Sequence, residues 1–270
     1  TMDLDWTHLN SEIAREFTDV SSLALELIAG SQARNLEVAG TDLQGNAFSA
    51  SARQTPDRQA LTIFQRNDQE AEASPPLQAM LPALADGKAR FNGSVTAEFA
   101  DARLVVAVQD FWQRWPKAVS LNGDRLTLAI LPQQPSPDFG QDLPFWLVFP
   151  FCEGKYRTKW GMAFTERISI DLTGQTSRAE MAANRDLPVI AVLPAQWYHQ
   201  CQVFGDVSVP KGKQFAAWDE WFEKCTDDIL AMRERQREYG YFNFGDTFGE
   251  RGRNWTNNEY DPAHGLFMQF

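Results

Sequence analysis

Residues 116–131 read PKAVSLNGDRLTLAIL, and no other stretch indicates the fold so clearly. The Asn-Gly pair at 122–123 is typical of a tight hairpin turn, because such turns require positive φ angles that these two residues tolerate. Leu126, Leu128 and Ile130 alternate with other residues, so they share one face of a strand. We therefore expect an antiparallel hairpin with one face on a core. Its two strands are predicted at 116–121 and 125–131.

Similar short strand patterns occur through most of the first two hundred residues. Leu23, Leu25 and Leu27, for example, alternate with small or polar residues. Residues 66–78 are polar and include Pro75 and Pro76, which predicts a loop. Many short strands separated by turn-forming residues are typical of a β-sandwich or supersandwich, so the fold class is predicted as mainly β. Further strands are predicted at 61–63, 103–108, 145–151, 167–172 and 189–193.

The period of the apolar residues changes after Phe215. Trp218, Trp221, Cys225, Ile229 and Met232, among others, recur at helical spacing, which predicts a long amphipathic helix. Its aromatic stripe requires a large surface to pack on, and Gly240 is expected to end it. We therefore expect a central β-sandwich domain over residues 1–207. An α-helical segment that begins an α/α toroid is expected over residues 208–270.

The last residues predict a second helix that has no room to develop. Asp261 is an expected N-cap and Pro262 an expected first helical residue, yet only eight residues follow, most of them apolar. A helix cut off in its first turns leaves an apolar face unburied. We therefore expect the sequence to be a piece of a longer protein.

Composition excludes several classes of function. The chain has 270 residues, of which 36 are acidic and 25 basic, so its formal net charge is −11. Nucleic-acid binding requires a basic face, and none is expected here. No run of about 18 apolar residues predicts a transmembrane helix, and no signal peptide is recognisable, so the compartment stays open. Cys152, Cys201 and Cys225 are widely spaced, without metal-ligand spacing; we expect buried thiols, with one disulfide as the alternative.

A loop rich in aromatic and polar residues, 239–264, is the first candidate site. It lies between two predicted helices, and loops on a rigid scaffold often carry function. Alternatively, its Asp and Asn residues only cap helices and close turns. His264 is expected in the first helical turn, where the helix dipole favours the neutral imidazole. The oxygen ligands make calcium possible without defining a coordination set, so no cofactor and no metal is predicted.

A basic strip at residues 155–160 is the second candidate site. The distribution of the tryptophans also allows a carbohydrate-binding surface. Arg157 has the planar fork that binds a carboxylate through two hydrogen bonds. Alternatively, the strip is an exposed sheet edge whose lysines prevent further pairing. All nine tryptophans except Trp6 lie after residue 110. They belong either to an aromatic-rich core or to a surface that faces carbohydrate.

Two motifs, the second in two parts, resemble one known family. The run DFWQRWPKAVSLNGDRLTLAILP at 110–132 resembles the central β-sandwich of the YetA-like, exo-rhamnogalacturonan lyase-like proteins. NFGD at 243–246 and WTNNEYDPAHGLFMQF at 255–270 resemble the start of their C-terminal α/α toroid. In that family a RIFT barrel precedes the sandwich. The resemblance implies that a barrel precedes this sequence and that most of a toroid follows it.

The same resemblance implies a polysaccharide lyase that acts on an acidic polysaccharide or oligosaccharide, such as rhamnogalacturonan. The reaction is β-elimination, in which a base removes the proton next to the uronate carboxylate and an acid protonates the leaving oxygen. Loop 239–264 holds residue types suited to proton transfer, namely Tyr260 or Tyr241 together with His264, although the family does not assign these roles individually. The candidate substrate-binding residues, chosen by residue type, are Asn243, Asp246, Arg253, Trp255, Asn257, Asn258, Glu259 and Arg157.

Two other functions stay open. A glycoside hydrolase on the same scaffold would use two carboxylates, and Asp246 with Glu259 is the candidate pair. A non-catalytic carbohydrate-binding or structural module would use the aromatic side chains as platforms for sugar rings.

Overall fold

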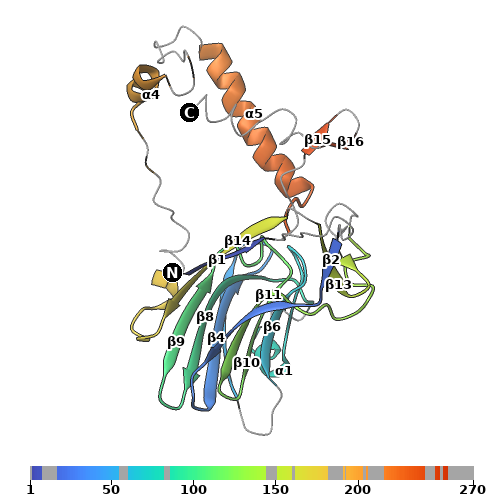
Figure 1. The fold of residues 1–270 in the computed structure, drawn as a ribbon, viewed down its shortest axis with the longest axis vertical. Coiled ribbons are helices and arrows are strands. Elements are labelled where there is room, and N and C mark those ends of the chain that lie inside the picture. The colour runs from blue at the N-terminus through green and yellow to red at the C-terminus, as the bar shows by residue number, and fades with distance from the viewer. Residues whose placement is uncertain are drawn as a thin grey trace. The chain divides into compact units, whose positions relative to one another are not determined.

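The computed structural model describes residues 2–7, 17–54, 60–81, 86–143, 151–159, 162–181, 191, 193–202, 205, 216–240, 247–249 and 252–254 (Figure 1). The chain divides into two compact units. The first comprises residues 1–188 with 239–242, and the second comprises 189–238 with 243–270. The division into domains at residue 207 stays a prediction.

The first unit is mainly β, as predicted, and all its strand pairs are antiparallel. The six-stranded sheet has the order β1 (Met2–Thr7), β14 (Ala163–Asp171), β9 (Arg103–Val108), β8 (Arg90–Phe99), β4 (Ala33–Thr41), β5 (Ala47–Arg53). The five-stranded sheet has the order β3 (Leu23–Ile28), β11 (Arg125–Leu131), β10 (Lys117–Asn122), β6 (Leu61–Gln65), β7 (Ala71–Ala73). A three-stranded sheet joins β12 (Phe151–Cys152), β13 (Lys155–Lys159) and β2 (Phe17–Val20).

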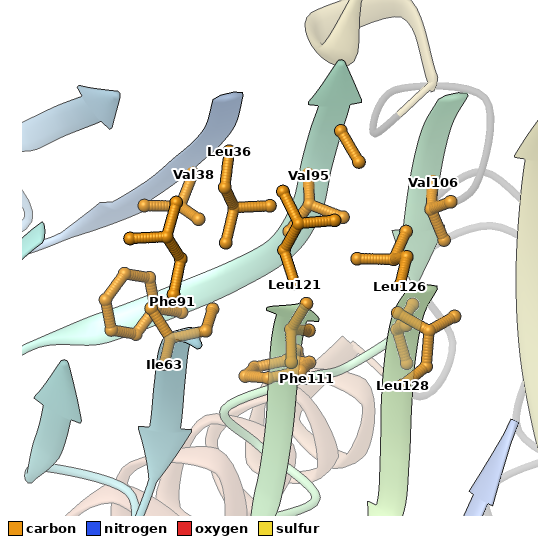
Figure 2. Close-up of a cluster of buried hydrophobic side chains, with 14 of the residues drawn as sticks. Leu36, Val38, Ile63, Phe91, Val95, Val106, Phe111, Leu121, Leu126 and Leu128 are labelled. Carbon is orange, nitrogen blue, oxygen red and sulfur yellow. The ribbon is translucent and has the colours of Figure 1, made fainter. Parts of the chain in front are cut away.

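The core lies between the two larger sheets, which makes the unit a sandwich. Figure 2 shows Leu36 and Val95 of the six-stranded sheet in one cluster with Leu121, Leu126 and Leu128 of the five-stranded sheet. All of these side chains are fully buried or nearly so. Each buried leucine stabilises the fold by about 2 kcal/mol relative to an exposed one. The alternating pattern of the sequence therefore reflects two inner sheet faces.

The predicted hairpin is confirmed, with one difference in its turn. Strands β10 and β11 pair from Ala118↔Ala129 to Asn122↔Arg125. Asn122 is therefore the last paired residue, and the two-residue turn consists of Gly123 and Asp124. Gly123 has a φ of 61°, as such a turn requires.

Not every local prediction holds. Residues 66–78 were expected as a loop, but they contain β7 and the short helix α1 (Pro75–Gln78). Strand β7 forms because it pairs with β6, and α1 forms because its two prolines suit a helix start and Leu77 is fully buried. Of the strand expected at 145–151, only Phe151 is described, in β12. Of the strand expected at 189–193, only residues 191 and 193 are described, and neither lies in a strand.

The second unit contains α4 (Ala195–Cys201), the long helix α5 (Ala216–Arg235) and a small hairpin of β15 (Thr247–Gly249) with β16 (Gly252–Asn254). Helix α5 confirms the helical period of the sequence. No residue of α5 is buried among the described parts of the chain, and Trp218 and Trp221 are 59% and 53% exposed. The expected packing of the aromatic stripe is therefore not seen there. That this helix begins a toroid stays a prediction.

Gly240 does not end α5, contrary to the prediction. The Glu238 N–H donates to the Arg233 carbonyl (2.9 Å), and the Arg237 N–H donates to the Glu234 carbonyl (3.2 Å). Together with the φ of 54° at Arg237, these bonds form a Schellman motif. The helix is thus closed three residues earlier, by an arginine in the left-handed conformation.

The cysteines also differ from expectation. All three are free, Cys201 is exposed, and the other two are only partly buried. Cys201 is exposed because it ends α4, which has no buried residue. Among the described residues, no helix is long and apolar enough to cross a membrane.

Candidate functional site

Most of the residues expected to bind or transform a substrate lie outside the described part of the chain. They are Tyr241, Asn243, Asp246, Trp255, Asn257, Asn258, Glu259, Tyr260 and His264. Arg253 lies in β16, where its backbone pairs with Phe248. The roles given to all these residues stay predictions, as does the N-cap at Asp261.

Arg157 already binds a carboxylate of the same chain. The pairing of β13 with β2 places it opposite Asp19. Its Nε and Nη2 donate to the two carboxylate oxygens at 2.8 and 3.0 Å. These hydrogen bonds lower the pKa of Asp19 and raise that of Arg157. The fork geometry expected of Arg157 is therefore present, with an internal partner.

The alternative reading of an exposed sheet edge holds only in part, because β12 pairs with Lys155 and Tyr156 but, within the described part of the chain, not with residues 157–159. Strand β13 pairs with β2 on one side and with β12 on the other. Tyr156 is fully buried and donates its hydroxyl to the Pro132 carbonyl at 2.5 Å. Burial raises the pKa of that hydroxyl. Tyr156 is therefore a core residue rather than a platform for a sugar.

The described residues do show where the candidate loop 239–264 begins. Tyr239 is only 7% exposed, and its ring lies 4.9 Å from that of Trp112, centroid to centroid. The Gly240 N–H donates to the Gln113 carbonyl at 2.7 Å. A Cβ at Gly240 would lie 3.2 Å from the ring of Trp115, so a larger residue would have to displace that ring. The first two residues of the loop are thus held against the segment that connects β9 to β10.

This connecting segment is itself held by buried charges. Lys117 and Glu166 have fully buried side chains, and Lys117 Nζ lies 2.9 Å from Glu166 Oε1. Arg114 Nη2 lies 3.2 Å from the same oxygen, and Arg114 Nη1 donates to the Thr165 carbonyl at 2.7 Å. Because Lys117 belongs to β10 and Glu166 to β14, the ion pair links the two sheets. No pattern in the sequence predicts this pair, because its members are 49 residues apart.

Burial determines the electrostatics of this cluster. It lowers the pKa of Lys117 to about 8, while the nearby Glu166 carboxylate acts in the opposite direction. The second carboxylate oxygen of Glu166 accepts no hydrogen bond from the described residues. The cluster is therefore a costly buried arrangement that positions the segment carrying Trp112 and Trp115.

Other cationic side chains of the first unit include Arg90, Arg34 and Arg53. The Arg90 guanidinium lies 4.1 Å from the centroid of the Trp112 ring, a cation–π contact. Arg34 and Arg53 line a groove of about 940 Å³. Among the described residues, no cluster of His, Cys, Asp or Glu side chains could hold a metal ion.

No model of a known protein family matches this chain, and no curated protein matches it either. The family resemblance of residues 110–132, 243–246 and 255–270 therefore depends on those motifs alone.

Proposed function

We propose that this chain belongs to a polysaccharide lyase that cleaves uronic-acid-containing glycans of the rhamnogalacturonan type by β-elimination. The observation that carries the proposal is the packing of Tyr239 and Gly240, the first two residues of loop 239–264, against the sandwich. The loop starts at a buried tyrosine packed on Trp112 of the sandwich. This contact fixes the first residues of the loop within the first unit. A catalytic site requires side chains held close to their productive geometry, so a fixed starting point favours a site on that loop.

The residue types of the loop fit β-elimination. In the proposal, Tyr260, Tyr241 and His264 transfer protons to and from the sugar. Arg253, Asn257 and Asn258 bind the carboxylate and stabilise the negative charge that develops on it. Trp255 stacks on a sugar ring, and Asn243, Asp246 and Glu259 bind hydroxyl groups.

Charge near the start of the loop supports an acidic substrate. A chain of formal net charge −11 repels a polyuronate except where cations are concentrated. Arg90 places one positive charge near the start of the loop, since it stacks on Trp112, which in turn contacts Tyr239. The Nε of Arg90 donates to the Asp68 carbonyl at 2.8 Å, which orients the guanidinium.

The test is an assay of the full-length protein on rhamnogalacturonan, with the ultraviolet absorbance of the unsaturated uronate product as readout. We expect product from the unmodified protein and a fall of about 10²- to 10⁴-fold in kcat for Tyr260→Phe and for His264→Ala. His199→Ala, at an exposed histidine of α4, is the matched control and should keep its activity.

Three outcomes would overturn the proposal. New reducing ends without an unsaturated product would indicate a glycoside hydrolase, with Asp246 and Glu259 as the carboxylate pair to test next. Binding of the glycan without cleavage would indicate a non-catalytic carbohydrate-binding module. If the protein neither binds nor cleaves the glycan, this substrate class is excluded.

A further inference from the structure

A groove of about 940 Å³ lies in the first unit, where α1 packs against β5 and the ends of β4 and β5 meet. Its volume falls near the top of the range for small-molecule sites. Apart from Glu98 and Ala52, its lining residues are of three kinds: two arginines, polar groups from neighbouring strands, and an apolar rim from α1 and the residues that follow it.

Strand pairing brings the two arginines together, although they are 19 positions apart in the sequence. Asn35 on β4 lies opposite Arg53 on β5, and the Gln54 N–H donates to the Arg34 carbonyl at 3.0 Å. Both arginine side chains are exposed, and neither forms an ion pair with the described residues. Glu98, opposite Asn35 on β8, is the acidic residue of the groove, so its formal charge is positive by one.

Polar groups beside the arginines are already oriented. The Ser51 hydroxyl donates to Asn35 Oδ1 at 2.9 Å, which leaves the Asn35 amide N–H groups to donate elsewhere. Gln54 Nε2 donates to Asn122 Oδ1 at 3.2 Å. Such prior orientation reduces the entropy that binding must overcome.

The three kinds of side chain match one class of ligand. Two guanidinium groups suit a carboxylate, and the amide and hydroxyl groups suit sugar hydroxyls. Met80, 60% exposed at the rim, offers an apolar surface to the C–H face of a sugar ring. In a chain of net charge −11, a locally positive groove selects anions.

We propose that this groove binds a uronic-acid residue of an oligosaccharide, with Arg34 and Arg53 holding its carboxylate. The groove is then a substrate-binding subsite in addition to the loop 239–264. This inference depends on the substrate class proposed above and not on the elimination chemistry.

The test is isothermal titration calorimetry of the full chain with a rhamnogalacturonan oligosaccharide and with the same oligosaccharide after reduction of its carboxyl groups. Tyr260→Phe serves as the background, so that cleavage does not consume the ligand. Arg34→Gln and Arg53→Gln should each weaken binding of the acidic oligosaccharide about tenfold, because each removes a charged hydrogen bond. Arg235→Gln, at an exposed arginine of α5, makes the same charge change and should leave the affinity unchanged.

Several results would overturn the inference: equal weakening by Arg235→Gln, unchanged affinity in the two groove variants, or equally tight binding of the carboxyl-reduced oligosaccharide. Displacement of the oligosaccharide by inorganic phosphate or an acidic peptide at equal concentration would indicate a general anion site instead. The lyase assay separates this inference from the proposed function. If the protein forms the unsaturated product but the two arginine variants keep their affinity, only the proposed groove subsite is refuted. If binding depends on the two arginines but no unsaturated product forms, only the proposed lyase function is refuted.

Discussion

Replacing Lys117 by methionine is expected to remove a pH dependence of folding stability that burial of this lysine creates. The folded-state pKa is about 8, against 10.5 for a free lysine. Between these values the unfolded chain binds more protons than the folded one, so stability rises with pH. The stability that the folded protein gains from holding Lys117 neutral is fully present above the unfolded pKa of 10.5. It is lost as the pH falls through the folded pKa of about 8.

The size of this effect follows from the pKa difference. Integrating proton binding from about pH 7 to about pH 9.5 gives a gain of about 2 kcal/mol for the unmodified protein relative to the variant. The charged groups that act on Lys117 are Glu166, Arg114 and Asp110. In Lys117→Met, Arg114 still pairs with Glu166 at 3.2 Å, and methionine has a similar length and flexibility, so we expect the sandwich to form.

Urea unfolding of both proteins over this pH range measures the difference in the free energy of unfolding. The readout is how the difference in unfolding free energy between the two proteins changes with pH, and a constant difference in stability does not count. Lys155→Met, at an exposed lysine of β13, should keep the pH dependence of the unmodified protein. A difference between the unmodified protein and Lys117→Met that stays constant from about pH 7 to about pH 9.5 would refute the reasoning.

Three other changes have clear expected outcomes. Gly93→Ala should cost about 3 kcal/mol or more, because Gly93 has a φ of 78° and a Cβ there would contact the Val108 carbonyl and lie 2.6 Å from Phe111 Cβ. Gly45→Ala, at a φ of 86° in open space, should cost only about 1 kcal/mol, and similar losses for the two in urea unfolding would contradict this account. Tyr156→Phe should cost about 1 kcal/mol at neutral pH through its lost hydrogen bond to the Pro132 carbonyl. Burial raises the pKa of Tyr156, so above the free-tyrosine pKa of 10.0 this side chain ionises first in the unfolded chain and the folded protein loses stability. The Tyr156→Phe variant should lack this loss of stability. An equal change of the unfolding free energy with pH in the two proteins above pH 10.0 would contradict this expectation. Cys201→Ser should remove the fastest-reacting thiol in a titration with Ellman's reagent, since Cys201 is the exposed cysteine, and an unchanged fast phase would exclude this assignment.

Predictions from the sequence succeeded where neighbouring residues carry the information. The hairpin of β10 and β11 follows from its turn residues and alternating leucines, and α5 follows from its helical period. They failed where a distant partner decides. The segment 66–78 contains β7 and α1 because β6 and the core supply pairing and burial, and composition within the segment does not reveal either.

The candidate site shows the same division. Loop 239–264 was selected by composition, and the structure adds that Tyr239 and Gly240 pack on Trp112 and Trp115. The bidentate geometry expected of Arg157 is present, yet its partner, Asp19, lies 138 positions away and was not predictable. The arginines of the groove gave no signal either, since only the pairing of β4 with β5 brings them together.

The sequence by itself determined the mainly-β class, the central hairpin, the long helix and the acidic charge of this protein. These properties depend on φ preferences, on the period of apolar residues and on composition, all of which are local or additive. Only the tertiary structure decided which charges are buried and which partners they have. Lys117 meets Glu166 because two sheets close on each other, and burial then lowers its pKa. Solvent access and charge pairing depend on long-range packing, which no local pattern specifies.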